Sequence, residues 1–492
     1  HRQRNGYVDN PFAPDDGDPG ALNVEAVGAK LRGEWGALKA TCMFDYSKTT
    51  GVPAAFQVRF ASANFRSYYA NQTIGTPLVI SPDYQDTLAL EPMRNWAINK
   101  GHTLNLELAL SDNLTFKSIS GYRRLLVDFP TSYTPPGILG PLTGSTTPQP
   151  VGHYAQDNFD EFARQYSQEF QINGNIGNLS FVSGLFYYNE YTWADTLARS
   201  ILVTSPTTAR ALNTRSVYNA RTESYAAFAQ ASYKPAMFDD RLEITVGARY
   251  TKDKKSAKQT SPLVRQDRRS FDNFSYMLSL AYHINDDVMT FAKYTTGYRA
   301  GGFNIRATAA GQAFFFPSEK AKAAEVGIKS ELFDRHLRFN ASLFHTQYDD
   351  LQVTTYTNTA SGGATGFTNP ARAKFKGFDA EIVALPFHNF RITGGIGYTD
   401  AKYDNILFPA PGTGVITNYA DIARFGYLAK WTSNLALDYT IPYTGIGDGN
   451  LRGAMSTRSR RWAHPTNLPS FNPFNDEIVS PAHQIFEARL TW

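Results

Sequence analysis

The stretch TLNLELAL, residues Thr103–Leu110, alternates between apolar and polar side chains. Its leucines fall on one face of an extended strand, and the Thr, Asn and Glu residues between them fall on the other, because successive side chains of a strand point to opposite faces. The apolar face suits the hydrocarbon interior of a membrane, and the polar face suits water. The same pattern recurs in LEITVGAR, residues Leu242–Arg249, and in LRFNASL, residues Leu337–Leu343. The repetition predicts many strands that each separate an apolar from a polar environment.

Connectors of two kinds alternate between these strands. Only residues 111–113 separate the strand quoted above from the next one, whereas the following connector runs from about residue 127 to 161. Another long connector is expected from about residue 194 to 222. Outer-membrane β-barrels have short turns on the periplasmic side and long loops on the extracellular side. The alternation therefore predicts an all-β fold, a transmembrane antiparallel β-barrel with two unlike ends.

The composition agrees with such a barrel and excludes other classes of protein. Aromatic residues make up 14% of the 492 residues, which suits girdles of Tyr and Phe at both membrane surfaces. The sequence lacks a run of about 18 apolar residues, so a transmembrane helix is excluded. The net charge of +4 is small and no basic run is concentrated, so nucleic acid is not expected as a partner. Cys42, the only cysteine, shares the alternation phase of Leu38 and Phe44 and is expected to face lipid.

About seventeen strands are expected from the alternation. The size of a large barrel follows its strand number, so residues 1–492 are interpreted as one barrel domain. Bacterial single-chain barrels have an even number of strands, so the odd count predicts that at least one strand is missing. The expected ranges are approximately 24–33, 36–46, 102–110, 114–126, 163–173, 179–193, 223–235, 241–255, 271–284, 288–299, 322–333, 337–353, 375–386, 390–403, 427–442, 450–463 and 483–492.

The sequence predicts no catalytic centre. The nine histidines are dispersed and form no His-Glu-x-x-His motif, so neither a catalytic metal nor another cofactor is expected. A Gly-x-Ser-x-Gly nucleophile motif is also absent from the sequence, and the protein is not expected to be an enzyme. Asp15, Asp16 and Asp18 form an acidic cluster. Clustered carboxylates suit calcium, but the neighbouring glycines and proline equally suit a solvated turn, and both interpretations stay open.

The segment FAKYTTGYRAGGFN, residues Phe291–Asn304, resembles the hallmark strand and loop of TonB-dependent outer-membrane receptors. The resemblance covers nearly the whole chain, and the order of the matching blocks is that of the family. The other blocks that are similar are RNGYVDN (Arg4–Asn10), LTFKSISGYR (Leu114–Arg123), the segment ending in GARYTKDKKS (Tyr233–Ser256), the segment containing EVGIKS (Pro317–Val353) and TNPARAKFKGFDAE (Thr368–Glu381).

The resemblance implies a transport receptor of which this sequence is the barrel portion. Members of the family carry an N-terminal plug domain with a short energy-coupling box, followed by a barrel of about 22 strands. Neither the plug nor the box is found in this sequence. By its place in the family pattern, the barrel is expected to have lost about three strands before Arg4–Asn10 and about two after the last strand. Trp492 is accordingly interpreted as the end of a truncated barrel rather than as the terminal aromatic residue of a complete one.

The resemblance also implies the function and the partners. A scarce nutrient, such as an iron–siderophore complex or another large solute, would be bound outside the cell. The inner-membrane TonB complex, acting through the missing plug, would supply the energy for import. Outer-membrane lipid, lipopolysaccharide and an accessory surface protein are further expected partners in the bacterial outer membrane. The sequence does not identify the nutrient, and a passive porin-like channel or a structural barrel without a plug is the alternative.

Charged residues of both signs are expected on the water-facing side of the strands. In a receptor they would hold the plug by hydrogen bonds and ion pairs, whereas in an open channel they would only solvate the pore. The candidate residues are Glu107, Glu169, Glu243, Arg249, Glu325, Lys329, Asp379, Glu381, Asp438, Glu487 and Arg489.

An aromatic cluster lies in the loop that follows the hallmark strand. An exposed apolar cluster often marks an interaction surface, so the cluster and the residues near it are candidates for ligand capture. Packing against neighbouring loops is the alternative. The candidate residues are Arg299, Phe303, Asn304, Phe314, Phe315 and Phe316.

Overall fold

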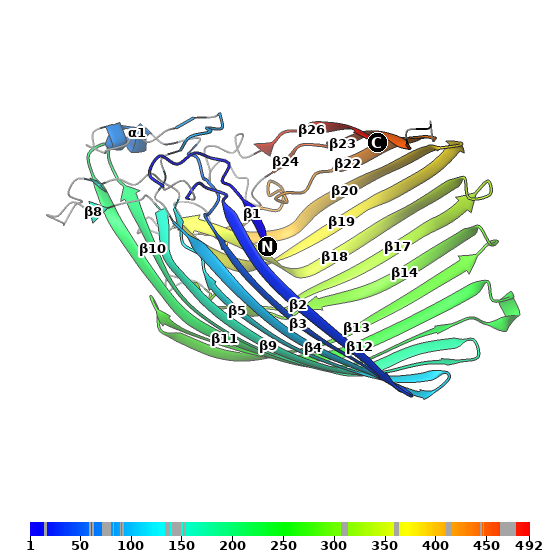
Figure 1. Cartoon of the computed structure of the whole chain (residues 1–492). Helices are drawn as coiled ribbons and strands as arrows, with labels where there is room; N and C mark the ends of the chain where they lie inside the picture. The colour runs from blue at the N-terminus through cyan, green and yellow to red at the C-terminus, as the bar shows by residue number, and fades with distance from the viewer. Residues whose placement is uncertain are drawn as a thin grey trace.

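The computed structural model describes the chain except residues 14–16, 59–60, 62, 71–79, 82, 89, 91–92, 133–137, 140–148, 151–153, 307–312, 359–363, 410–414, 443–444, 446 and 463–478. Its main element is one sheet of twenty strands, which curves into a deep trough (Figure 1). Three strands of this sheet, β1, β6 and β21, have only two or three residues. The others are β2 (Leu22–Trp35), β3 (Leu38–Gly51), β4 (Asn95–Ser111), β5 (Leu114–Asp128), β9 (Tyr154–Ile176), β10 (Leu179–Val203), β11 (Ala209–Tyr233), β12 (Leu242–Ser261), β13 (Arg265–His283), β14 (Val288–Arg299), β17 (Glu319–Leu332), β18 (Leu337–Asn358), β19 (Ala364–Phe387), β20 (Phe390–Pro409), β22 (Trp431–Ile441), β23 (Gly449–Arg458) and β26 (His483–Thr491).

The remaining elements are short and lie in the connectors. Within the described residues, one α-helix and one turn of 3-10 helix occur. Neither is long and apolar enough to cross a membrane. The short elements are β1 (Arg2–Arg4), α1 (Ala63–Ala70), β6 (Thr131–Ser132), β7 (Ile138–Leu139), β8 (Gln149–Pro150), η1 (Ala236–Phe238), β15 (Gly302–Phe303), β16 (Phe315–Phe316), β21 (Ile416–Asn418), β24 (Arg461–Trp462) and β25 (Val479–Ser480).

Each long strand pairs antiparallel with the long strand that follows it, from β2 to β26. The seventeen expected strands are therefore confirmed, in the expected order. The short β1 pairs with the start of β2. In the part of the chain that the structure describes, no ladder joins β26 to β2. The prediction of an all-β fold built on one large antiparallel sheet is confirmed.

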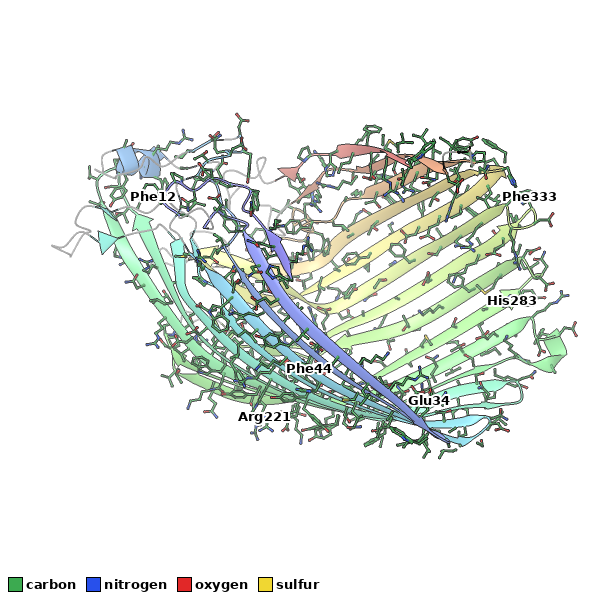
Figure 2. The ribbon with its side chains drawn as sticks, in the orientation of Figure 1. Phe12, Glu34, Phe44, Arg221, His283 and Phe333 are labelled. Carbon is green, nitrogen blue, oxygen red and sulfur yellow. The ribbon has the colours of Figure 1, made fainter. Side chains whose placement is uncertain are left out.

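The short turns gather at one end of the sheet, as predicted. Residues 36–37, 112–113, 177–178 and 388–389 each join two strands at this end. Glu34, His283 and Phe333 mark the same end in Figure 2. By the rule that short turns face the periplasm, the opposite end is expected to face outward and is called the extracellular end.

At the extracellular end, several strands are longer than expected. β10 continues to Val203 and β11 begins at Ala209, so residues 204–208 are the whole connector. The expectation of a long loop reaching about residue 222 is therefore wrong. Outside the membrane both faces of a strand meet water, so the ladder of hydrogen bonds persists after the apolar alternation has ended. The alternation marks only the part of each strand that lies in the membrane.

The outward face of the wall carries an apolar band of membrane height. On β13, Phe274, Tyr276, Leu278, Leu280 and Tyr282 occupy every second position, and each is at least 41% exposed. A transmembrane strand needs about 9–11 residues, which is the length from Phe274 to the end of this series. On β13 the wall therefore presents an exposed apolar stretch that is long enough to span a membrane.

A girdle of aromatic rings borders this band on the extracellular side. Such girdles mark the interface between membrane and water, so the strands continue beyond the girdle into the extracellular space. The ring centroids are 6.2 Å apart for Tyr166–Tyr187, 5.1 Å for Tyr187–Tyr225 and 4.6 Å for Tyr398–Trp431.

Cys42 lies on the outward face, as predicted. It is exposed, and in the register of the sheet it lies opposite Leu31 on one side and Leu104 on the other. Residues directly opposite one another share a face of a sheet. The thiol therefore points in the same direction as the leucines of the apolar band.

Candidate ligand-binding lumen

The connector between β14 and β17 lies across the concave face of the sheet. Arg306 in this connector donates hydrogen bonds from Nε and Nη2 to the hydroxyl of Tyr218 on β11, at 3.1 and 3.0 Å. β12 and β13 separate β11 from β14 in the sheet, so the connector reaches Tyr218 across the inside of the curve. The face that carries Tyr218 is therefore the inner face of the wall.

The structure places all the charged residues predicted to face the lumen on this inner face. Arg249 lies opposite Phe228, which has the same phase as Tyr218 on β11. Lys329 lies opposite Asn340, which in turn lies opposite Glu381. The residues so placed are Glu107, Glu169, Glu243, Arg249, Glu325, Lys329, Asp379, Glu381, Asp438, Glu487 and Arg489. Their contact with a plug stays a prediction.

Neighbours within the wall hold several of these charges in place. Glu107 accepts a hydrogen bond from Asn105 Nδ2 at 3.1 Å, and Lys117 Nζ lies 3.6 Å from its carboxylate. Asp438 forms an ion pair with Arg452 at 2.8 Å. Because these partners belong to the same strand or to adjacent strands, the carboxylates keep fixed positions on the wall.

Two of the predicted cations are held by aromatic rings instead. The Arg249 guanidinium lies 5.3 Å from the ring centroid of Phe186 and 5.5 Å from that of Phe228. Lys329 Nζ lies 5.9 Å from the ring of Phe291. A cation over the face of a ring is attracted by the ring but keeps its charge, so it can still bind an anion.

A cavity of about 480 Å³ indents the inner wall beside Asp379 and Glu381. Glycines create it, because a Cβ at Gly397 would lie 2.8 Å from Asp379 Oδ1, and one at Gly395 would lie 2.6 Å from Asn434 Oδ1. Without side chains at these glycines, the acidic and amide side chains lie against the wall. The cavity offers carboxylate and amide oxygens to a polar occupant.

The predicted aromatic cluster forms a small hairpin at the inner wall. Gly302–Phe303 pairs with Phe315–Phe316, and buried Asn304 donates from its backbone N–H to the carbonyl of Phe314 at 2.7 Å. Its Nδ2 also donates to the carbonyl of Ala313 at 2.9 Å. Asn304 therefore fixes the hairpin rather than standing free.

The rings of this hairpin lie against β13. Phe315 stacks on Phe271 with centroids 6.0 Å apart, and Arg269 covers Phe315 at 4.8 Å. Phe314 lies 5.3 Å from Phe303 and is approached by Arg265 at 5.9 Å. The rings are half-buried. Packing, which was the alternative to ligand capture, accounts for most of their contacts, and ligand capture stays a prediction.

Arg299 lies at the base of the same hairpin. Its Nη2 donates to Glu319 Oε2 at 2.6 Å, and that oxygen also accepts the backbone N–H of Gln352 at 2.8 Å. Gln352 Nε2 donates to the carbonyls of Ala300 and Pro317, both at 3.1 Å. This network closes the two ends of the connector against β18, so Arg299 positions the hairpin.

A second inward-folded connector, residues 415–430, was not found from the sequence. Phe425 stacks on Tyr403 of β20 with centroids 4.0 Å apart and planes inclined by 12°, and it lies 4.7 Å from Phe375 of β19. Tyr403 is 6% exposed, and burial raises the pKa of its hydroxyl. A lone Phe in a polar loop carries no local signal of such a contact.

A polar cluster on the inner face was also missed from the sequence; it lies on the extracellular side of the girdle of aromatic rings. Tyr188 and Gln165 both donate to Glu190 Oε2, each at 2.6 Å. In register, Thr222 lies between Glu190 and Lys255. Burial lowers the pKa of the Lys255 ammonium. The sequence around each of these residues does not indicate the cluster, because only the register of three strands places them in one row.

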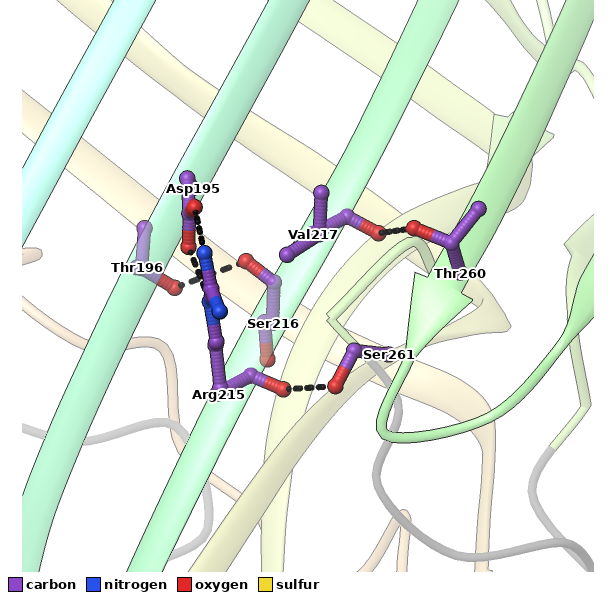
Figure 3. A network of polar contacts seen from close by, with 7 residues as sticks. All are labelled: Asp195, Thr196, Arg215, Ser216, Val217, Thr260 and Ser261. Carbon is purple, nitrogen blue, oxygen red and sulfur yellow. Dashed lines mark hydrogen bonds and ion pairs between the residues drawn. The ribbon is translucent and has the colours of Figure 1, made fainter.

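The hairpin of β10 and β11 is fastened by a network beyond the membrane (Figure 3). Arg215 donates from Nε and Nη2 to the two carboxylate oxygens of Asp195, at 2.9 and 2.5 Å. These hydrogen bonds lower the pKa of the Asp195 carboxyl. On the neighbouring strand, Ser261 Oγ donates to the carbonyl of Arg215 at 2.8 Å. The network joins three strands at the extracellular rim.

The acidic cluster proposed for calcium is only partly described. Asp15 and Asp16 lie outside the described residues. Asp18 Oδ1 accepts the backbone N–H of Asn10 at 3.0 Å, and Asn10 Nδ2 donates to the carbonyl of Leu90 at 3.0 Å. Among the described residues, no group of three or more His, Cys, Asp or Glu side chains is placed to hold a metal ion. The contacts of Asp18 suit a fixed turn.

A family model and curated relatives match this sequence. The family model described as TonB dependent receptor-like, beta-barrel, matches residues 45–492. The pesticin receptor of Yersinia pestis is 26% identical over 250 residues, which cover 47% of this chain and 35% of the relative. The match therefore spans about a third of the length of that curated relative.

Solved structures of similar fold are larger than this chain. The ferric yersiniabactin uptake receptor FyuA from Yersinia pestis matches with a TM-score of 0.71 at 18% identity, covering 100% of this chain and 66% of that one. The siderophore receptor PiuA from Acinetobacter baumannii matches with a TM-score of 0.66 at 14% identity, covering 96% and 68%. At these identities the likeness concerns the fold. Because the family model matches most of its length, this chain belongs to the TonB-dependent receptor-like β-barrel family.

Proposed function

We propose that this protein is the barrel of an outer-membrane receptor that binds a scarce nutrient, such as an iron–siderophore complex or another large solute, and imports it with energy from the TonB complex. The inner face carries the proposal: fixed charges line the wall, and two connectors fold over it with aromatic rings. Such a surface suits a large polar solute held by many contacts. Similar proteins named as a pesticin receptor and a ferric yersiniabactin uptake receptor support this class of cargo.

Residues 1–492 act in this proposal as a single barrel domain that surrounds a plug. The inner-face charges, among them Glu107, Glu169, Asp379 and Glu381, hold the plug by hydrogen bonds and ion pairs. The TonB complex pulls on the plug from the periplasm. Work is required because a ligand bound tightly on the outside is released only when its binding state is made less favourable.

The surroundings of the barrel supply its remaining partners. Outer-membrane lipid covers the apolar band, lipopolysaccharide surrounds the extracellular half, and an accessory surface protein meets the extracellular connectors. The hairpin that carries Arg299, Phe303 and Phe314–Phe316 lies on the route of the ligand into the lumen. It contributes guanidinium groups and aromatic faces to the first contacts with the ligand.

An uptake experiment tests the proposal. The receptor is expressed in a Gram-negative strain without siderophore receptors of its own, and cells are given ⁵⁵Fe-labelled ferric yersiniabactin, ferric citrate or a ferric catecholate. We expect iron from at least one probe to accumulate in cells with TonB and not in cells without it. Failure of all three probes would overturn the assignment to siderophore uptake.

Two variants and a conductance measurement separate this function from a passive channel. Arg249→Gln removes an inner-face charge and should reduce uptake, whereas Lys402→Gln removes an exposed outward charge and should leave uptake unchanged. In planar bilayers the complete receptor should show little steady conductance. A large constant conductance, together with uptake that does not depend on TonB, would establish the porin-like alternative.

A further inference from the structure

One cross-strand row on the inner face of the wall runs from a carboxylate to a guanidinium. Asp379 lies opposite Gly397, Gly397 lies opposite Thr432, and Thr432 lies opposite Arg458 of β23. His483 of β26 ends the row beside Arg458. All five residues line the cavity of about 480 Å³ described above. Strands lie about 4.8 Å apart, so about 14 Å separate the backbones of Asp379 and Arg458, with Gly397 and Thr432 as the floor between them.

Arg458 has a hydrogen-bond donor that the wall leaves unused. Its Nε donates to His483 Nε2 at 3.1 Å, and its Nη2 donates to Ser480 Oγ at 2.7 Å, so the guanidinium is held in one plane. Its Nη1 is buried and has no hydrogen-bond partner. A buried donor of a charged group is unfavourable when it lacks an acceptor, and such a group calls for an explanation. An acceptor bound at Arg458 would remove this cost.

A second guanidinium with an unused donor lies beside the first. Arg461 of β24 lies opposite Ser480 of β25, the residue that Arg458 also contacts. Arg461 Nε is buried and has no hydrogen-bond partner. The guanidinium lies 5.6 Å from the ring centroid of Tyr427, and a ring holds a cation without cancelling its charge. The positive charge of Arg461 acts on Arg458, so the two guanidinium groups repel one another.

No carboxylate neutralises this pair of arginines in the part of the chain that the structure describes, since neither of them forms an ion pair. Lower on the same strand and face, by contrast, Arg452 is bound to Asp438 at 2.8 Å. A guanidinium presents its N–H donors in a fixed fork that matches the two oxygens of a carboxylate. The two arginines therefore form an anion site that suits a carboxylate, which can place one oxygen on each of them.

The site lies toward the end of the wall that is called extracellular. The backbone N–H of Ser459, next to Arg458, donates to the carbonyl of Trp431 at 2.9 Å, and Trp431 belongs to the girdle of aromatic rings. A solute that enters the lumen from outside reaches this level before the deeper parts of the wall. Asp379, at the far end of the row, repels an anion, so a carboxylate in the cavity is directed to the arginines.

We propose that Arg458 and Arg461 bind a carboxylate group of the imported solute, with the body of the solute in the cavity over Gly397 and Thr432. The carboxylate neutralises two guanidinium groups that otherwise repel one another, and it accepts hydrogen bonds from the donors that the wall leaves unused. The inference rests on the proposed function as an import receptor and narrows its cargo to solutes that carry a carboxylate.

Calorimetric titration of the purified complete receptor in detergent tests the site. Citrate, a tricarboxylate, is the probe, and its uncharged trimethyl ester is the control compound. We expect citrate to bind and the ester to bind at least about tenfold more weakly, because a hydrogen bond to a charged group is stronger than one to a neutral group. Arg461→Gln should weaken citrate binding by about tenfold or more. This variant removes no hydrogen bond within the described wall, so the fold should be kept.

The matched control variant is Arg460→Gln. Arg460 is the neighbour of Arg461 but is exposed, and its guanidinium lies 5.8 Å from the ring centroid of Trp462. Citrate binding by this variant should stay within about twofold of the parent, because exposed charges contribute little. Equal weakening by Arg460→Gln and Arg461→Gln, equal affinity of the parent for citrate and the ester, or no binding of citrate by the parent would each overturn the proposal.

Conductance in planar bilayers separates a carboxylate of the solute from a carboxylate of the plug. The double variant Arg458→Gln, Arg461→Gln of the complete receptor should keep the low conductance of the parent. A raised steady conductance would mean that the arginines hold the plug, and it would overturn the proposal. The titration needs neither cells nor TonB, so its failure is distinct from a failure of import: uptake of a ferric catecholate without citrate binding would overturn only this inference.

Discussion

Phe425, in the connector before β22, stacks on Tyr403 of β20 with ring centroids 4.0 Å apart. Phe425 also meets Phe375 at 4.7 Å, and buried Ala423 of the same connector belongs to the apolar cluster around Tyr403. Backbone hydrogen bonds from Tyr419 to Ile406 and from Tyr427 to Trp462 fasten the same connector, so the stack is one of several contacts that hold it on the wall.

Phe425→Ala should loosen this connector. We expect the free energy of its docking to fall by about 2 kcal/mol, less than for a fully buried Phe, because the ring is half-buried and part of its area stays in water. Hydrogen exchange of the amides at 419–427 should accelerate, while exchange in β22 stays slow. Phe425→Tyr keeps the ring and is the control; equal exchange in the Ala and Tyr variants would contradict the assignment.

Arg306 and Tyr218 should be energetically coupled. A hydrogen bond that involves a charged group contributes about 1.5–3 kcal/mol, and exposure of Arg306 places the expected coupling near the lower value. A double-mutant cycle of Arg306→Ala and Tyr218→Phe, with exchange of the β15 amides as the measurement, gives this coupling. Additive effects of the two substitutions would mean that the connector is held by other contacts.

The Asp195–Arg215 pair should make the β10–β11 hairpin sensitive to acid. The pKa of Asp195 is lower in the folded hairpin than its ordinary value of 3.8, so the pair stabilises the hairpin above pH 3.8 and the stabilisation is lost as the pH falls through the lower, folded-state pKa. Hydrogen exchange at 204–208 should therefore become faster in acid after correction for the intrinsic rate.

Asp195→Asn should remove that part of the acid sensitivity. Asp160→Asn on β9 is the matched control, because Asp160 lies opposite Asp195 and forms no ion pair within the described residues. If both variants keep the acid sensitivity of the parent, the Arg215 pair is not its source.

Gly377→Ala should destabilise the barrel, because its Cβ would collide with the backbone carbonyl of Tyr398 and lie 2.8 Å from the ring of Phe344. A carbonyl within a ladder cannot move aside, so we expect a loss of about 1–3 kcal/mol, as for other overpacked sites. The temperature at which the heat-modifiable band converts in gels measures it. Gly453→Ala, where nothing lies within 4 Å of the added Cβ, should convert at the temperature of the parent.

The sequence predicts best what the membrane imposes on it. A strand in a bilayer must present apolar side chains to lipid at every second position, so the strands and the inner position of residues such as Lys329 and Glu381 follow from the alternation. Beyond the membrane this constraint no longer acts, and the extension of β10 to Val203 was missed because its sequence, ADTLARSILV from Ala194, has no apolar alternation. The aromatic cluster at Phe315 was recognised, but its contact with Phe271 depends on how a connector folds back over the wall.

The contact of Phe425 with Tyr403 is even harder to predict from the sequence. The two residues are joined only through the path of a connector, and neither has a neighbour whose spacing suggests the pairing. The row from Glu190 through Thr222 to Lys255 shows the same limit, because it depends on the register of three strands. Register is set by the whole sheet, so single positions become meaningful only once all pairings are known.

The length of β10 has a practical consequence at the cell surface. From Tyr187 in the girdle to Val203 the strand rises about 40 Å above the membrane, at about 3.3 Å per residue and a tilt of about 40°. The tip at 204–208 thus stands well clear of the bilayer on an arm in which β9 pairs with β10 as far as Ser200. An epitope inserted at this tip should be reachable by antibodies on intact cells, and a fluorophore attached there would report the height and tilt of the barrel without touching its lumen.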